Sequence, residues 1–136
     1  MPSRARTAAL TGLVLALAGA GAAYAVNDYN RRQDVKAEAA ALTGGDPDRA
    51  PDLMTRYGCA GCHRIPGVRG ASGRVGPPLG QFAGRVYVGG VLANKPDNLV
   101  RWIVNPRAVS AKTAMPVTGI SETDARHVAA YLLTLR

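Results

Sequence analysis

The sequence predicts a small all-α domain that follows an N-terminal apolar helix. Residues 96–105 and 121–135 each place apolar side chains at the spacing of one helix face. Residues 7–27 carry no charged side chain, and no segment shows a strand pattern of comparable strength. With 136 residues, the chain has room for one small domain and one targeting or anchoring segment.

Residues 1–26 are predicted to be a signal peptide or a membrane anchor. Arg4 and Arg6 precede the uncharged run, and Ala23-Tyr24-Ala25 is typical of a signal cleavage site. The run is also close to the about 20 residues that cross a bilayer. A retained anchor would account for the charged arm that follows. Both alternatives place the rest of the chain outside the cytoplasmic membrane.

Residues 27–45 are predicted to be a charged helical stalk and linker. Arg31, Arg32 and Lys36, together with a run of alanines, favour a solvated helix. Thr43-Gly44-Gly45 is expected to end this helix, because glycine disfavours helical backbone. Asp46-Pro47 then begins a domain that spans residues 46–136.

Three core helices are expected in this domain. The first runs to about Tyr57. The second begins at Pro96, a favoured first-turn residue, and stops before Pro106. The third begins at the capping pair Ser121 and Asp124. The side chains expected to face inward are Leu53 and Tyr57 in the first helix, Leu99, Trp102 and Ile103 in the second, and Val128, Tyr131, Leu132 and Leu135 in the third.

The run Cys59-Ala60-Gly61-Cys62-His63 predicts the cofactor that the chain binds. C-x-x-C-H spacing is the attachment signature of a c-type haem. From one helical turn, Cys59 and Cys62 can each form a thioether to a haem vinyl group, while His63 becomes the proximal ligand of the iron. These are the only cysteines of the chain. We therefore predict one haem c, covalent through Cys59 and Cys62.

Two other chemistries would use the same residues. In a zinc site, Cys59, Cys62 and His63 would be joined by His127, but adjacent Cys and His ligands fit the usual finger spacings poorly. A redox dithiol would need a βαβ pattern, which the sequence does not show. Covalent haem, detected on a stained denaturing gel, would exclude both.

The composition also favours a large apolar cofactor. The chain has one Phe, one Trp and five Tyr against 16 Gly and 9 Pro, so its own core would be thin. From residue 64 to residue 90 the chain is rich in glycine and proline. So long a loop is unusual in a small domain unless it wraps something. A haem would supply the missing apolar volume.

The sixth iron ligand decides the chemistry, and the candidates are Met54, Met115 and His127. Met54 precedes Cys59 too closely to reach the opposite haem face, so we expect it in the core. His127 lies in the last predicted helix and is expected at the surface or packed. Met115 lies in a loop and is followed by a proline that stiffens the backbone. We predict that His63 and Met115 bind the iron.

Six pieces of the sequence match one known pattern in order. They are Tyr57-Gly58-Cys59-Ala60-Gly61-Cys62-His63, Val75-Gly76-Pro77-Pro78-Leu79, Gly84-Arg85-Val86-Tyr87, Trp102-Ile103-Val104-Asn105-Pro106, Thr113-Ala114-Met115-Pro116 and Ala130-Tyr131-Leu132. Residues 46–136 thereby resemble a class I cytochrome c domain, whose fold wraps helices and long loops around one covalent haem. The chain is most similar to the cytochrome c domain fused to some bacterial oxidase subunit II chains and to small membrane-anchored cytochromes.

The resemblance implies further roles. Pro77 would offer its carbonyl to the ring N–H of His63. Arg85, Tyr87 and Trp102 would reach the haem propionates, which need hydrogen-bond donors; core packing is the alternative for Trp102. Gly58 and Tyr131 would mark the crossing of the first and last helices, where a small residue permits close approach.

His/Met ligation leaves no open coordination position and indicates a one-electron carrier, not an enzyme. The resemblance implies transfer between respiratory-chain components, towards a terminal oxidase, on the periplasmic side of the bacterial cytoplasmic membrane. A haem enzyme or gas-binding cytochrome is the alternative, and it requires that Met115 does not bind the iron. A bound subunit of a respiratory complex is equally compatible with the sequence.

The formal net charge of +8 bears on partners. Basic residues are scattered among glycines without a helix-borne stripe, so we expect no nucleic-acid partner. A basic face favours an acidic redox protein, because charge steering raises encounter rates. An ordinary solvated surface is the alternative. The loop residues that flank the ligand segments are Arg64, Arg69, Arg74, Lys95, Arg107 and Lys112.

Overall fold

The computed structural model describes residues 4–136, so the first three residues of the predicted signal or anchor lie outside it. The chain forms two compact units, one as far as Asp34 and one spanning Val35–Arg136. The secondary structure is 62% helix and 5% strand, which confirms the predicted mainly helical class.

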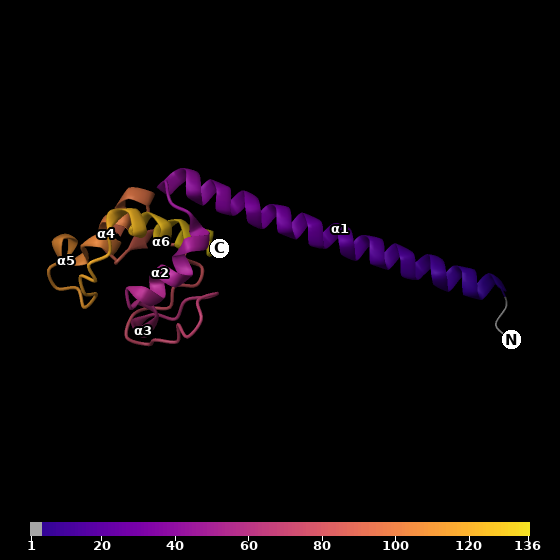
Figure 1. The fold of residues 1–136 in the computed structure, drawn as a ribbon, viewed down its shortest axis with the longest axis horizontal. Coiled ribbons are helices and arrows are strands. Elements are labelled where there is room, and N and C mark those ends of the chain that lie inside the picture. The colour runs from indigo at the N-terminus through magenta and orange to yellow at the C-terminus, as the bar shows by residue number, and fades with distance from the viewer. Residues whose placement is uncertain (1–3) are drawn as a thin grey trace. The chain divides into compact units, whose positions relative to one another are not determined.

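Helix α1 (Arg4–Thr43) is one continuous helix, coloured indigo to violet in Figure 1. Its first half carries exposed apolar side chains, among them Leu10, Leu13 and Leu17. Among the described residues it is the one helix long and apolar enough to cross a membrane. After the uncharged run, the next charged residue is Asp28, whose carboxylate pairs with Arg31 at 2.8 Å and with Arg32 at 2.7 Å. The predicted apolar N-terminal helix is therefore present.

The last turns of α1 belong to the second unit. Thr43 is buried, and its hydroxyl donates to the Ala39 carbonyl at 2.8 Å. The Arg126 guanidinium donates to the Thr43 carbonyl at 3.0 Å and so satisfies an acceptor that the helix end leaves unpaired. The helix ends at Thr43, directly before the two glycines that the sequence predicts as the break. Gly44 adopts a left-handed backbone with φ +70°, which favours glycine.

Three helices form the core of the second unit, as predicted. They are α2 (Ala50–Arg56), which follows the 3-10 turn η1 (Pro47–Arg49), α4 (Pro96–Val104) and α6 (Glu122–Thr134). Helix α6 packs against α2, α4 and η1. The Ser121 hydroxyl accepts the Asp124 amide at 3.1 Å, so the predicted N-cap is confirmed. The buried apolar side chains of the three helices include Leu53, Leu99, Ile103, Val128 and Leu132.

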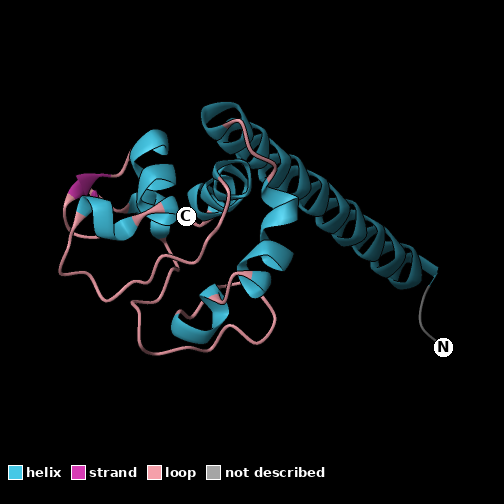
Figure 2. Cartoon of the chain, turned by 60° about the vertical axis from the view of Figure 1, so that its left-hand side comes forward, coloured by secondary structure: helices cyan, strands magenta, loops and turns pink. Residues whose placement is uncertain are grey.

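Several short elements were not expected from the sequence. A two-stranded antiparallel ladder pairs β1 (Tyr87–Val88) with β2 (Leu92–Ala93). Single turns form η2 (Phe82–Gly84) and α5 (Pro106–Val109), whereas the turn α3 (Cys59–Cys62) is the helical turn expected for the attachment run. Strands of two residues are too short to produce a period-2 pattern, so this ladder has no sequence signal. The remaining chain between α3 and α4 is mostly loop, drawn pink in Figure 2, as the glycine and proline content predicts.

Candidate functional site

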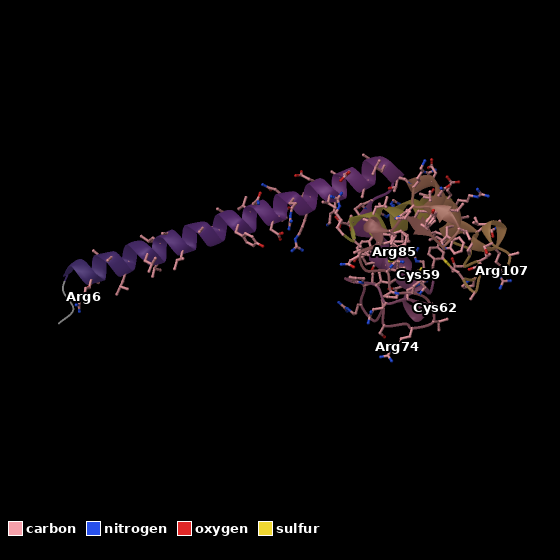
Figure 3. All side chains as sticks on the ribbon, turned by 180° about the vertical axis from the view of Figure 1, so that it is seen from behind. Arg6, Cys59, Cys62, Arg74, Arg85 and Arg107 are labelled. Atoms are coloured by element: carbon pink, nitrogen blue, oxygen red, sulfur yellow. The ribbon has the colours of Figure 1, made fainter. Side chains whose placement is uncertain are left out.

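The predicted site residues line one cavity of about 380 Å³ in the second unit. Its walls come from α2, α3, the loop from residue 75 to residue 82, β1 and its turn, α4, the loop before α6, and α6 itself. Figure 3 labels Cys59, Cys62 and Arg85 on this part of the ribbon. All eight residues singled out as cofactor-binding line the cavity: Cys59, Cys62, His63, Pro77, Arg85, Tyr87, Trp102 and Met115.

The short helix α3 presents the two thiols. It begins after Gly58, whose φ of +76° reverses the chain between α2 and α3. Cys59 and Cys62 are both half-buried and form no disulfide. Burial raises the pKa of the Cys59 thiol, so this group stays protonated at neutral pH.

The structure corrects the role expected for Gly58. A Cβ atom at Gly58 would meet nothing within 4 Å, so this glycine serves the backbone turn and not a close helix crossing. The close approach to Tyr131 belongs to Gly67 instead. The Tyr131 hydroxyl donates to the Pro66 carbonyl at 2.6 Å, beside Gly67. Helices α2 and α6 are joined by Tyr57, whose hydroxyl donates to Asp124 at 2.7 Å.

The imidazole of His63 is oriented by the backbone of Pro77. His63 leaves α3 in an extended conformation, with φ −111° and ψ 145°. Its Nδ1 lies 2.8 Å from the Pro77 carbonyl oxygen. Because a carbonyl only accepts, Nδ1 carries a proton, and in the neutral imidazole Nε2 then keeps its lone pair. His63 is therefore held in the tautomer that can bind a metal through Nε2.

Gly76 supports the same imidazole, and no role was predicted for it. Its amide donates to the Cys62 carbonyl at 2.8 Å, which holds the loop against the end of α3. Its Cα faces the ring of His63 with no room for a side chain. The sequence signal was the Gly-Pro-Pro run itself, in which the glycine directly precedes the proline that accepts the hydrogen bond.

Of the three candidates for the sixth ligand, two reach the cavity. Met115 is half-buried in the loop between α5 and α6, and its amide donates to the Thr113 hydroxyl at 3.2 Å. Met54 also lines the cavity, from α2, and is 1% exposed. His127 is buried elsewhere: its Nδ1 accepts the Asp46 amide at 2.7 Å. This confirms the expectation that His127 is packed.

The geometry also bears on the zinc alternative. In the part of the chain that the structure describes, no group of three or more His, Cys, Asp and Glu side chains is arranged to hold a metal ion. His127 does not line the cavity that Cys59 and Cys62 share. The four ligands proposed for zinc are therefore not brought together.

Arg85, Tyr87 and Trp102 also line the cavity. The Arg85 guanidinium stacks over the Phe82 ring at 4.9 Å from its centroid and donates to the carbonyls of Pro78 and Gly80. Tyr87 is exposed on β1, and Trp102 is 9% exposed on α4.

The turn that carries Arg85 is held by an asparagine for which the sequence analysis predicted no role. The Asn94 amide donates to the carbonyls of Phe82 and Arg85, both at 3.1 Å.

Comparison with known proteins agrees with this arrangement. The profile of the family described as cytochrome c matches residues 47–136. The chain belongs to the cytochrome c family. It is also 34% identical, over 79 residues, to cytochrome c oxidase subunit 2 of Alkalihalophilus pseudofirmus. That match covers 57% of this chain and 22% of the relative, so the chain spans about a fifth of that protein's length. No solved structure matches the chain.

A cytochrome c domain implies a covalently bound haem with iron and haem-based electron transfer. The cavity fits that group. Two free thiols, an imidazole whose Nδ1 faces the Pro77 carbonyl and a thioether sulfur line one space. Apolar side chains such as Leu79, Phe82 and Leu99 make much of the remaining wall, as an apolar macrocycle requires.

Proposed function

We propose that this cytochrome carries one electron at a time between respiratory-chain components. The observation that supports this most strongly is the placement of His63 and Met115 on one cavity, with His63 held by Pro77 at 2.8 Å. An imidazole and a thioether are the ligand pair of electron-transfer haems.

In this proposal each residue has a definite task. Cys59 and Cys62 would hold the macrocycle covalently, and the iron would be held by His63 through Nε2 and by Met115 through Sδ. When bound, the haem supplies reversible one-electron exchange between Fe(III) and Fe(II). The protein would keep both ligands in place in the two oxidation states, so that little structure would reorganise. The Pro77 carbonyl keeps the His63 ring in one tautomer and raises its basicity.

Arg85, Tyr87 and Trp102 are proposed to hold the haem propionates. Their side chains carry guanidinium, hydroxyl and indole donors, and all three residues line the cavity. A propionate carboxylate that leaves water needs such donors, and a charged partner strengthens the hydrogen bond. Arg85 is prepared for this task because its side chain is already held by Phe82 and two carbonyls.

The proposed site of action is the periplasmic side of the cytoplasmic membrane, with α1 as the anchor. Support comes from the length and apolar character of α1 and from the relative, which is an oxidase subunit. The proposed acceptor is a terminal oxidase that presents an acidic surface. The formal charge of +8 supports such a partner, because opposite charges accelerate encounter. The intact mass of the mature protein tests the anchor, since a chain that begins at Val26 would be a cleaved, unanchored form.

The iron ligands are tested by absorption spectroscopy of the purified Fe(III) protein. We expect covalent haem on a denaturing gel and a methionine-to-iron charge-transfer band in the wild type. Met115→Ala should lose this band and keep the covalent haem, whereas Met54→Leu should keep both. A wild-type protein without the band would favour an open coordination position and contradict the carrier function. Loss of the band in Met54→Leu alone would contradict the assignment of Met115.

A further inference from the structure

The tight turn between β1 and β2, the magenta strands of Figure 2, brings its backbone against the indole of Trp102. A Cβ atom at Gly89 would lie 2.5 Å from Cη2, 2.5 Å from Cζ2 and 2.6 Å from Cζ3 of Trp102. These three atoms form the outer edge of the six-membered ring of the indole. Cβ atoms in proteins are not found at such separations. The ring can approach this closely because residue 89 is a glycine.

The turn alone does not explain this contact. Gly89 and Gly90 have φ values of +57° and +74°, and the Val91 amide donates to the Val88 carbonyl at 3.2 Å. Positive φ at both central residues is typical of a tight hairpin turn and favours glycine. Gly90 meets the same backbone requirement, but a Cβ atom there would contact nothing within 4 Å. The two neighbours therefore differ in the indole that lies against Gly89.

Both sides of the contact are fixed in place. Asn94 follows β2, and its backbone amide donates to the Val86 carbonyl at 2.9 Å. Asn98 of α4 donates to the Ala93 carbonyl of β2 at 3.0 Å, which ties the helix to the ladder. Helix α4 also packs against α6 and buries Leu99. Since neither the turn nor the helix can yield freely, an added methyl group would displace the indole.

The contact belongs to the wall of the haem cavity. Gly89, Gly90 and Trp102 all line this cavity, together with Tyr87 and Val88 of β1. Trp102 is 9% exposed, so the protein encloses almost all of its side chain. The proposed task of its indole N–H is to donate to a haem propionate. Hydrogen bonds weaken steeply with distance and misalignment, so the position of the ring decides whether this bond can form.

The position of the indole also bears on the reduction potential. A propionate is a negative charge near the iron, and negative charge there favours the more positive, oxidised form. A donor that bonds to the carboxylate offsets part of this charge. Loss of the donor should therefore lower the potential.

We propose that Gly89 is a positioning residue for Trp102. By lacking a side chain, it holds the indole where the N–H can donate to a haem propionate, and it thereby keeps the reduction potential high. The inference rests on the proposed electron-carrier function and on the proposed propionate contact of Trp102. It adds to them a residue that acts only through another side chain.

The test compares Gly89→Ala with Gly90→Ala in the full-length holoprotein in neutral detergent. Both variants place a methyl group at a positive φ in the same turn, but only the first would meet the indole. The reduction potential is measured for each, and the indole N–H signal is recorded by proton–nitrogen correlation NMR of the reduced protein. The chain has one tryptophan, so this signal identifies Trp102 directly.

We expect Gly89→Ala to lower the potential, to shift the indole N–H signal and to speed the exchange of this proton with solvent. Gly90→Ala should leave the potential, the signal and the exchange rate at their wild-type values. Equal changes in the two variants would show that strain in the turn, and not the contact with the indole, is responsible. That result would overturn the proposal, as would an unchanged indole signal in Gly89→Ala.

Trp102→Phe tests whether Gly89 acts through the indole. Phenylalanine has no N–H and a smaller ring, so this variant should itself lower the potential, by at least as much as Gly89→Ala does. In the Trp102→Phe background, Gly89→Ala should cause no further fall, because the ring edge that it would meet is gone. Such non-additivity is the sign of a direct interaction between two residues. A wild-type potential in Trp102→Phe, or a further fall of full size in the double variant, contradicts the proposal.

Two controls keep the outcome interpretable. If Gly89→Ala does not assemble with haem, the double variant with Trp102→Phe should assemble, because removal of the indole relieves the contact; a double variant that also fails would refute the contact. The methionine-to-iron charge-transfer band, recorded on every variant, reports the iron ligands separately. A wild type without this band would contradict the carrier function, while the indole signal would still show whether Gly89 positions Trp102. Failure of the one and failure of the other are therefore distinguishable.

Discussion

The imidazole of His63 occupies the space where a side chain at residue 76 would begin. A Cβ atom at residue 76 would lie 2.3 Å from Cε1, 2.5 Å from Nδ1 and 2.8 Å from Nε2 of His63. The next residue, Pro77, provides the carbonyl that accepts the Nδ1 proton. One two-residue segment thus sets both the position and the tautomer of the ring.

The first prediction concerns Gly76→Ala. The added methyl group must push His63 or the loop away, because separations under 3 Å are not tolerated. We expect covalent haem to be retained through Cys59 and Cys62, while the Fe(III) absorption spectrum and the reduction potential change. Gly84→Ala is the control, since a Cβ there meets nothing within 4 Å. A Gly76→Ala protein with the wild-type spectrum and potential would show that the ring is positioned by other contacts.

A second prediction follows from the hydrogen bond between Tyr57 and Asp124. The bond to this carboxylate raises the pKa of Tyr57 above its ordinary value of 10.0. The folded protein therefore holds the phenol proton more tightly than the unfolded chain. The resulting stabilisation is present below about pH 10 and is lost as the pH rises through the folded-state pKa.

This pH dependence is measurable by denaturant unfolding followed by circular dichroism. Tyr57→Phe should lower stability at pH 7 and flatten its decline above pH 10. Tyr29→Phe, on the exposed part of α1, serves as the control. An unchanged alkaline decline in Tyr57→Phe would assign the decline to other groups.

His127 provides a third prediction. The imidazole accepts the Asp46 amide through Nδ1 at 2.7 Å, and Nε2 lies 3.1 Å from Arg49. His127→Leu leaves a backbone donor without its acceptor, which we expect to cost roughly 1–3 kcal/mol of unfolding free energy. His127→Asn should cost less, because its side-chain oxygen can take the place of Nδ1. Equal losses in the two variants would mean that packing, and not this hydrogen bond, is what His127 contributes.

A fourth prediction tests the core apart from the haem site. Leu53 is 4% exposed and does not line the cavity. Leu53→Ala should lower the unfolding free energy by about 2–5 kcal/mol. The charge-transfer band should persist in the folded protein. Loss of that band under native conditions would show that α2 packing and iron ligation are coupled.

The helices were predictable because their signals are local. Pro96 and Pro106 bound α4, and Ser121 caps α6, so the ends follow from residues at or beside them. The ladder of β1 and β2 was not predictable, since two paired residues per strand carry no periodicity. The compact unit begins at Val35 and the family profile matches from residue 47, so the domain start predicted at residue 46 stays a prediction. Contacts such as Arg126 with Thr43 join residues 83 positions apart, and no local pattern reports them.

The sequence alone indicated that Cys59, Cys62 and His63 form a haem-attachment run and that Met115 stands in a loop, since both depend on residue type and spacing. Only the tertiary structure decided which residues share the cavity, that Nδ1 of His63 faces the Pro77 carbonyl, and that Gly76 faces the ring while Gly58 serves a turn. The physical reason is that hydrogen bonding and steric exclusion depend on distances between atoms that folding alone brings together.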